Sequence, residues 1–294
     1  MPRVSDLLLT ALAPAIWGST YIVTTEFLPD GYPVTVALLR ALPAGLLLLL
    51  IARRLPEYGW WGRVFLLGAF NFAIFWALLF VAAYRLPGGV AATVGAVQPL
   101  IVIFLARVAL GSPIIALSVV AALAGMAGVA LLILTPEAAL DPLGIAAGLG
   151  GAASMAAGTV LSRKWQPPVS LLTFTAWQLT AGGLLLLPLA LWLEPPLPAL
   201  STENVLGLVY LGLIGAAFTY VLWFRGISRI EPSAVSALGF LSPLTAVVLG
   251  WLVLDQSLTD LQMIGVITVL GSVWLSQFAG LRPRRLAPST AGRL

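Results

Sequence analysis

The sequence predicts an all-α integral membrane protein of ten transmembrane helices, arranged as two inverted five-helix repeats. Three observations carry this prediction: charge is scarce, the uncharged runs have the length of membrane spans, and the two halves of the chain match each other. Of 294 residues, 9% are charged, against about 25% in a soluble domain. So little charge cannot solvate the surface of a globular fold, and a bilayer is therefore the expected solvent.

Charged residues separate the ten expected helices. The uncharged runs are 7–25, 31–39 with 41–52, 64–84, 86–106, 108–136, 142–162, 165–193, 204–224, 232–254 and 261–281. Apart from the second, which Arg40 interrupts, each run can cross a hydrocarbon core about 30 Å thick at about 1.5 Å per residue. Membrane strands would instead show runs of about 10 residues with alternating polarity, whereas 46–51 is apolar on every face.

The connections between these runs are short and contain the turn residues Pro, Gly and Asp. Examples are 28–31, 86–89, 111–113, 166–168 and 195–198. None is long enough to hold an extramembrane domain. We expect one repeat at residues 1–137, a second at 138–281, and a basic, disordered cytoplasmic tail at 282–294.

Basic residues predict the orientation, because Lys and Arg concentrate on the cytoplasmic side of membrane helices. With the first residue inside, 13 of the 15 Lys and Arg residues are cytoplasmic, while Arg85 lies outside and Arg40 within a helix. Both termini are therefore expected on the cytoplasmic side of a bacterial-type inner membrane. The basic residues stand at helix ends rather than in one patch, so nucleic acid is not an expected partner.

An internal repeat relates the two halves of the chain. A shift of 144 residues aligns the later helices of each half, and a shift of 138 aligns the earlier ones. The matched pairs include Gly68 with Gly212, Trp76 with Tyr220, Arg85 with Arg229, Gly95 with Gly239, Pro99 with Pro243, and Arg40 with Gln178. Because five is an odd number, the copies cross the membrane in opposite senses. Inverted repeats place a substrate site near the midplane in many transporters.

Several motifs resemble the drug/metabolite transporter superfamily, in its ten-helix EamA-type branch. They are Trp17-Gly18-Ser19, Arg40, the segments around Pro99 and Pro243, and the run from Tyr220 to Gly226. The resemblance implies a secondary exporter of small metabolites, with helices 1, 3, 4, 6, 8 and 9 around a central cavity and helices 5 and 10 at the periphery. Within that branch the chain is most similar to the YddG-type exporters of aromatic amino acids.

Polar and aromatic residues at helical spacing form the expected substrate-binding set. They are Trp17, Thr20, Tyr21, Thr24, Asn71, Phe75, Gln98, Ser154, Thr159, Gln178, Thr219, Trp223 and Ser242. A cavity with aromatic walls and few hydrogen-bonding groups suits small amphipathic solutes. Together with the resemblance to the YddG-type exporters, this makes neutral or aromatic amino acids the expected substrates. The alternative for any single side chain is packing at an interface or bonding within its own helix.

Arg40 completes the binding set as the one charge well inside an expected helix. A charge at the bilayer centre costs about 2.5–3.5 kcal/mol, so it needs compensation. Arg40 either recognises a substrate carboxylate, or it pairs with Glu26 or extends to the outer interface, which is roughly 10 Å away along the helix.

Pro99 and Pro243 are the expected hinges of helices four and nine, each directly after a polar residue, Gln98 and Ser242. Proline removes a backbone donor and frees a carbonyl, which is tolerated where protein or a wet cavity satisfies it. The prolines are therefore expected to face the interior and to permit bending during alternating access. The alternative is a packing kink without a functional role.

The chain contains no Cys and no His, which excludes thiol and imidazole catalysis and Cys/His metal sites. We expect no enzyme activity, no metal and no cofactor.

A channel or a non-transporting membrane scaffold is the alternative to a transporter, although a channel would be expected to show rings of charge. Small residues at 121–128 and 144–148 favour close packing within a monomer, with a dimer through the fifth helix as the alternative. The interior offers no Asp, Glu or His for a proton relay, so proton coupling stays open.

Overall fold

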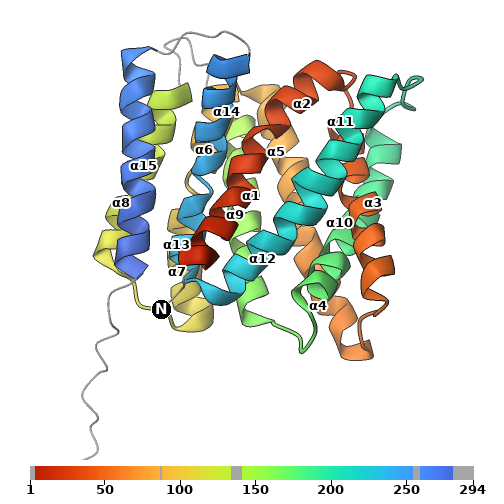
Figure 1. Ribbon diagram of the computed structural model, residues 1–294, viewed down its shortest axis with the longest axis horizontal. Helices are drawn as coiled ribbons and strands as arrows, with labels where there is room; N and C mark the ends of the chain where they lie inside the picture. The colour runs from red at the N-terminus through yellow and green to blue at the C-terminus, as the bar shows by residue number, and fades with distance from the viewer. Residues whose placement is uncertain (1–3, 87, 134–140, 254–258, 281–294) are drawn as a thin grey trace, which may run out of the picture.

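The structure, a computed structural model, describes residues 4–86, 88–133, 141–253 and 259–280. Ten segments of these residues are helical, long and apolar enough to cross a membrane, so the predicted ten-helix membrane fold is confirmed. The expected tail at 282–294 lies outside the described residues. In Figure 1 the helices stand side by side, and α1 begins at the same end of the bundle where α15 ends.

Five of the ten spans are continuous helices. The continuous ones are span two (α3, Pro33–Ala52), span five (α8, Ala116–Ile133), span six (α9, Pro142–Lys164), span seven (α10, Leu171–Leu193) and span ten (α15, Asp260–Gly280). Polar groups satisfy the first backbone N–H groups of several helices, as helix starts require. The Asp141 side chain accepts a hydrogen bond from Gly144 N, and both carboxylate oxygens of Glu194 accept from Val34 N and Thr35 N, at 2.6 and 2.7 Å.

The other five spans are interrupted. Span one breaks at Ser19, between α1 (Val4–Gly18) and α2 (Thr20–Phe27). Spans three and eight each contain a π-helical segment: α4 (Trp61–Gly68), Ala69–Ala73 and α5 (Ile74–Arg85), and α11 (Thr202–Gly212), Leu213–Phe218 and α12 (Thr219–Arg229). Spans four and nine break near their middle: α6 (Gly88–Gly95) and α7 (Gln98–Leu110), and α13 (Pro232–Leu238) and α14 (Leu241–Val253).

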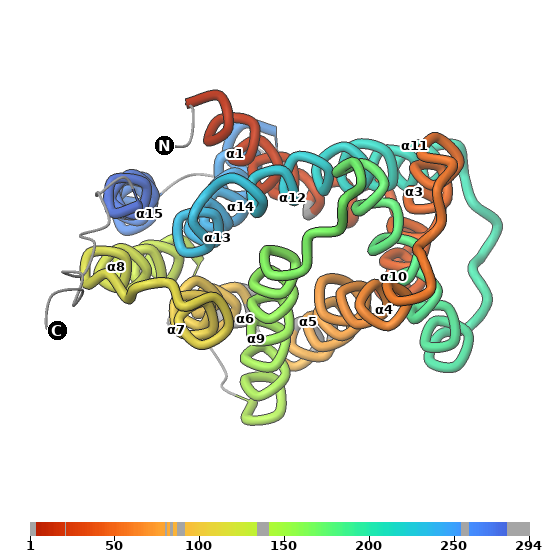
Figure 2. The backbone as a smooth tube through the Cα atoms, turned by 90° about the horizontal axis from the view of Figure 1, so that it is seen from below, coloured from red at the N-terminus to blue at the C-terminus, as the bar shows by residue number. Residues whose placement is uncertain are grey.

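The interruptions and the packing show the inverted repeat. The two π-helical segments begin 144 residues apart, at Ala69 and Leu213. In the packing, α1 contacts α12 and α14, while α9 contacts α5 and α7. Span one therefore packs on spans eight and nine as span six packs on spans three and four. Spans two and seven (α3 and α10) are equivalent in the two repeats, and so are spans five and ten (α8 and α15). The members of each pair pack against each other, and the two pairs lie near opposite edges of the bundle (Figure 2).

Glycines allow the closest helix contacts. A Cβ on Gly45 would lie 2.5 Å from Thr180 N, and a Cβ on Gly183 would lie 2.8 Å from Leu42 Cα, so α3 and α10 approach backbone to backbone. The small residues singled out in the sequence serve the same purpose within the chain: Gly128 meets Gly265 and Val269, and Gly144 meets Leu86. These small-residue faces pack inside one molecule.

Candidate functional site: a central cavity between the repeats

A cavity of about 520 Å³ lies between the two repeats, with walls from spans one, two, three, four, six, eight and nine. At one end it reaches the connection Pro29–Pro33, which joins spans one and two at the upper end of the bundle in Figure 1. The lining includes none of the described connections at the opposite end. The cavity is therefore open toward one membrane face only. Span two belongs to its wall, which the family resemblance did not imply.

Aromatic rings form the closed side of the cavity. Trp17 contacts Tyr220 and Trp223, with ring centroids 4.9 and 5.2 Å apart, and Phe72 contacts Tyr220 at 4.7 Å in an edge-on arrangement. Phe72 also meets Trp76 at 5.4 Å. Edge-on and tilted geometries of this kind are the favourable ones for aromatic pairs. The rings join spans one, three and eight and close the space below the cavity.

The carbonyl oxygen of Gly215 connects three elements beside the cavity. It accepts hydrogen bonds from Arg40 Nη2 at 2.7 Å, Thr219 Oγ1 at 2.9 Å and Trp17 Nε1 at 3.2 Å. Gly215 lies within the π-helical segment of span eight, where the regular backbone ladder of an α-helix is shifted. One backbone oxygen thus fixes side chains from spans one and two against span eight.

Arg40 lines the cavity and is partly buried. Besides its bond to Gly215, its guanidinium group lies 5.4 Å from the centre of the Trp76 ring, a distance at which a cation is attracted to the ring face. Arg40 and Asp30 are the only Asp, Glu, Lys or Arg residues among the described lining residues, and Asp30 belongs to the connection at the open end. The wall of the cavity is therefore cationic at the depth of Arg40.

Part of the sequence-predicted set meets in this cavity. The members that line it are Trp17, Thr20, Thr24, Arg40, Phe75, Gln98, Trp223 and Ser242, with both predicted hinge prolines, Pro99 and Pro243. The side chain of Tyr21 lies outside the described residues. Residues from spans one, two, three, four, eight and nine thus converge, as a midplane site between inverted repeats requires.

Five members of the set do not line the cavity. They are Asn71, Ser154, Thr159, Gln178 and Thr219, and all five are buried. Asn71 donates to Gln178 Oε1 at 2.8 Å and to Ser162 Oγ at 3.1 Å, so the amides join spans three, six and seven. Ser154 donates to Phe70 O at 2.8 Å, and Thr219 bonds Gly215 as described above. Bonds between and within helices thus involve Ser154, Gln178, Thr219 and the amide nitrogen of Asn71. Thr159 Oγ1 and Asn71 Oδ1 are buried and have no hydrogen-bond partner among the described residues.

Two aromatic lining residues, Trp76 and Tyr220, were absent from the predicted set. A signal for them existed in the sequence, because they occupy equivalent positions under the 144-residue shift. A site on a two-fold pseudo-axis draws equivalent positions from both repeats. Asp30 and Tyr32 at the open end carried no comparable signal.

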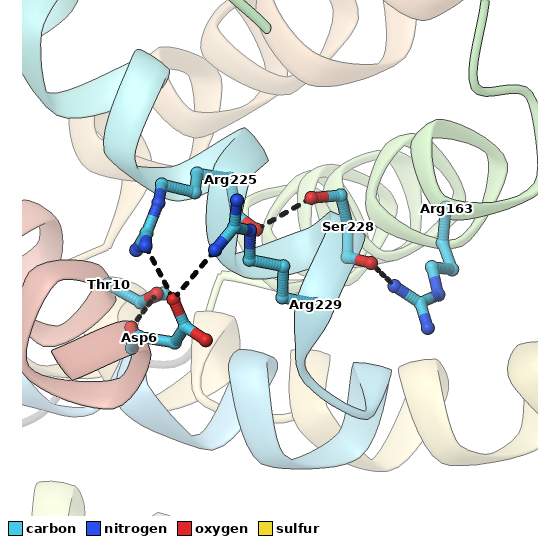
Figure 3. Close-up of polar contacts among 6 residues, drawn as sticks. All are labelled: Asp6, Thr10, Arg163, Arg225, Ser228 and Arg229. Carbon is cyan, nitrogen blue, oxygen red and sulfur yellow. Dashed lines mark hydrogen bonds and ion pairs between the residues drawn. The ribbon is translucent and has the colours of Figure 1, made fainter. Parts of the chain in front are cut away.

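Ionic contacts hold the bundle together at the closed end, as Figure 3 shows. Asp6 Oδ1 on α1 lies 2.6 Å from Arg225 Nη2 and 3.2 Å from Arg229 Nη1, both on α12. Arg163 on α9 donates to the carbonyl oxygens of Ile227, at 2.9 Å, and of Ser228. These four charged residues, which we call the closed-end cluster (Asp6, Arg163, Arg225 and Arg229), tie spans one and six to the end of span eight. A cation near the C-terminal carbonyls of a helix also interacts favourably with the helix dipole.

Comparisons with known proteins agree with this architecture. The chain matches the sequence model of the EamA-like transporter family over residues 5–134 and 142–278. It is 46% identical over 275 residues to Protein PecM of Dickeya dadantii, covering 93% of this chain and 92% of that protein. It is 31% identical to a chloroplastic WAT1-related protein of Arabidopsis thaliana, over 89% of this chain and 67% of that protein. A solved protein structure at 19% identity shares the fold, with a TM-score of 0.82 over 95% of this chain and 98% of that one.

Ten spans in two inverted repeats around a central cavity are an architecture of multi-pass membrane transporters, and the family match and the relatives show that the chain is a transporter and not an enzyme. The family match covers most of both repeats. The chain belongs to the EamA-like transporter family, within the drug/metabolite transporter superfamily.

Proposed function

We propose that the chain is a secondary exporter of small amphipathic metabolites, foremost neutral and aromatic amino acids, and that it works by alternating access. The observation that supports this is the cavity between inverted repeats, which is open at one end and closed at the other by aromatic rings and the closed-end cluster. A site accessible from one side at a time is what alternating access requires.

The charge distribution supports the direction of the open end. The closed end holds the start of α1 and the Arg-rich end of α12, which the positive-inside rule assigns to the cytoplasm. The cavity then opens away from the cytoplasm, toward the periplasm in an inner membrane, with both termini cytoplasmic. The unit we propose is a monomer of two repeats, 1–137 and 138–281, in the lipid bilayer.

A channel is the second candidate, and a non-transporting scaffold the third. A channel in its conducting state would show a path across the bundle, whereas aromatic packing closes one end of this cavity. The concentration dependence of uptake therefore distinguishes a carrier from a channel.

Purified protein in liposomes separates the three candidates. Radiolabelled L-phenylalanine is supplied outside vesicles that contain excess unlabelled L-phenylalanine. A carrier gives saturable uptake that the internal amino acid stimulates. Uptake that stays linear with concentration identifies a channel, and absence of uptake for a panel of small metabolites contradicts transport altogether. Repeating the assay with an imposed pH gradient decides whether protons are coupled.

A further inference from the structure

The cavity wall combines one fixed cation with a floor of aromatic rings. Arg40 is held in place by Gly215 O and by the face of Trp76. Arg40 lies seven residues into α3 from Pro33, which is roughly 10 Å deeper in the bundle than the helix start. Asp30, the one carboxylate among the described lining residues, precedes that start. At the depth of Arg40 an occupant therefore meets a positively charged side chain, and the described residues that line the cavity there include no carboxylate.

The uncharged polar groups of the wall favour the same kind of occupant. Gln98 Nε2 and Trp223 Nε1 are buried, and neither has a hydrogen-bond partner in the part of the chain that the structure describes. The indole N–H can only donate, and the Gln98 amide nitrogen is likewise a donor. Both residues line the cavity. Unsatisfied buried donors are better matched by an occupant rich in acceptors than by one rich in donors.

The chemical group that fits both features is a carboxylate. It is acceptor-only when ionised, it pairs with the two-pronged guanidinium group, and such charge-assisted bonds are the strong ones. An ammonium group has only donors to offer and would approach Arg40 against charge repulsion. The aromatic floor of Trp17, Tyr220 and Trp223 in turn suits a flat or apolar body.

We propose that the cavity selects its substrates through their carboxylate and their apolar body, and that an α-amino group is dispensable. The substrate class is then small monocarboxylates with an aromatic or bulky apolar body, of which aromatic amino acids are one member. This inference rests on the proposed transport function for its biological meaning. Binding to the cavity can be measured without transport, so the two can fail separately.

Three ligands that share a phenyl group and differ in their carboxylate and amino groups test which group the cavity recognises. L-Phenylalanine has both groups, 3-phenylpropionate lacks the amine, and 2-phenylethylamine lacks the carboxylate. Binding is measured by the shift in melting temperature of the purified protein, and transport by competition in the liposome assay. We expect 3-phenylpropionate to bind at least as tightly as phenylalanine and 2-phenylethylamine to bind at least about tenfold more weakly, the loss that removal of a charged hydrogen bond typically causes.

The outcomes distinguish the two proposals. Binding of 2-phenylethylamine as tight as that of 3-phenylpropionate overturns the inference, because the aromatic floor would then be binding a cation. Failure of 3-phenylpropionate to bind overturns it as well. Binding of 3-phenylpropionate without transport of any of the three ligands supports the inference and contradicts the export function.

Variants of Arg40 test whether this residue recognises the carboxylate. Arg40→Gln is expected to weaken the binding of 3-phenylpropionate by at least about tenfold and to leave the binding of 3-phenylpropanol, its uncharged analogue, unchanged. Arg40→Lys keeps the charge and serves as a second variant in case Arg40→Gln fails to fold. Its affinity for 3-phenylpropionate should fall several-fold, because lysine cannot pair bidentately with a carboxylate. Arg54→Gln is the matched control, since Arg54 is exposed and pairs with Glu57 away from the cavity. Unchanged 3-phenylpropionate binding in both Arg40 variants would contradict the proposal.

Discussion

At the scale of single residues, Asp6 joins span one to span eight at the closed end of the cavity. Its side chain is 7% exposed, whereas those of Arg225 and Arg229 are 22% and 50% exposed. The pair with Arg225 is therefore the better shielded of the two, and its 2.6 Å separation is the shorter. A shielded pair is screened less by salt and water than an exposed one.

Asp6→Asn is expected to lower the free energy of unfolding by about 1–3 kcal/mol, because Arg225 loses its carboxylate partner in a shielded place. Arg229→Gln removes only the half-exposed contact and should cost less than about 1 kcal/mol. The melting temperatures of the two variants in one detergent check the order. Equal melting temperatures would show that Asp6 does not hold the closed end.

At the scale of elements, spans four and nine break at equivalent places. α6 ends at Gly95 and α7 begins at Gln98, while α13 ends at Leu238 and α14 begins at Leu241. Across the breaks the backbone forms shorter turns, such as Val97 N to Val94 O and Phe240 N to Ala237 O. Pro99 and Pro243 follow these breaks and line the cavity. Each interruption consists of two residues, 96–97 and 239–240, and ends two and three positions before its proline. The proline lacks the backbone N–H that would continue the regular hydrogen-bond ladder across the interruption.

Pro99→Ala and Pro243→Ala are expected to slow transport several-fold while substrate affinity changes little. Alanine restores a backbone donor and favours a continuous helix, which would stiffen the segment that bends between the two access states. Initial rates and half-saturation concentrations in liposomes with equal protein content are the measurement. If both variants transport at the parent rate, the prolines are packing details and the hinge proposal is wrong, while the transporter assignment is unaffected.

Gly45→Val and Gly183→Val are each expected to prevent stable folding. A side chain at either position would meet the backbone of the facing helix below 3 Å, so α3 and α10 would have to separate, and overpacking of this kind is destabilising. Gly271→Val is the matched control, because Gly271 also lies in a membrane helix but has no atom within 4 Å of its Cβ position. Yield of monodisperse protein by size-exclusion chromatography should fall for the first two and hold for the third.

At the scale of the whole molecule, one end of the bundle is open to the cavity and the other is closed. The open end carries the connection with Asp30, and the closed end carries the closed-end cluster. Assignment of the closed end to the cytoplasm follows from the Lys and Arg count of the sequence. The side to which the cavity opens can therefore be tested by finding which end of the bundle faces the outside of the cell.

Single cysteines answer that question cleanly, because the chain contains none of its own. Thr25→Cys lies at the cavity mouth and is exposed, so it should react with an impermeant maleimide in intact cells. Tyr58→Cys, at a position that is 99% exposed next to the other end of α3, should react only after the cells are permeabilised. The reverse labelling pattern would contradict the proposed orientation, as would a reporter fused after Leu294 that appears outside.

The sequence by itself determined the ten spans and the duplication. Both can be read from the sequence directly: the length of an uncharged run must match the bilayer thickness, and the repeat is visible as matched residues at shifts of 144 and 138. The sequence also predicted Arg40, Gln98 and Ser242 as cavity residues, and all three line the cavity. The reason was that charged and polar groups are rare inside an apolar run and tend to face the interior of the bundle.

The tertiary structure decided which polar side chains reach the cavity. In a helix that is apolar on nearly every face, periodicity does not fix the rotation about its axis, and contacts with neighbouring helices do. Asn71 and Gln178 therefore bond each other across spans three and seven instead of facing a solute. Arg40 and Trp17 meet at Gly215, 175 and 198 residues away along the chain. Only packing brings such groups together, because each contact depends on how the two repeats close around the cavity.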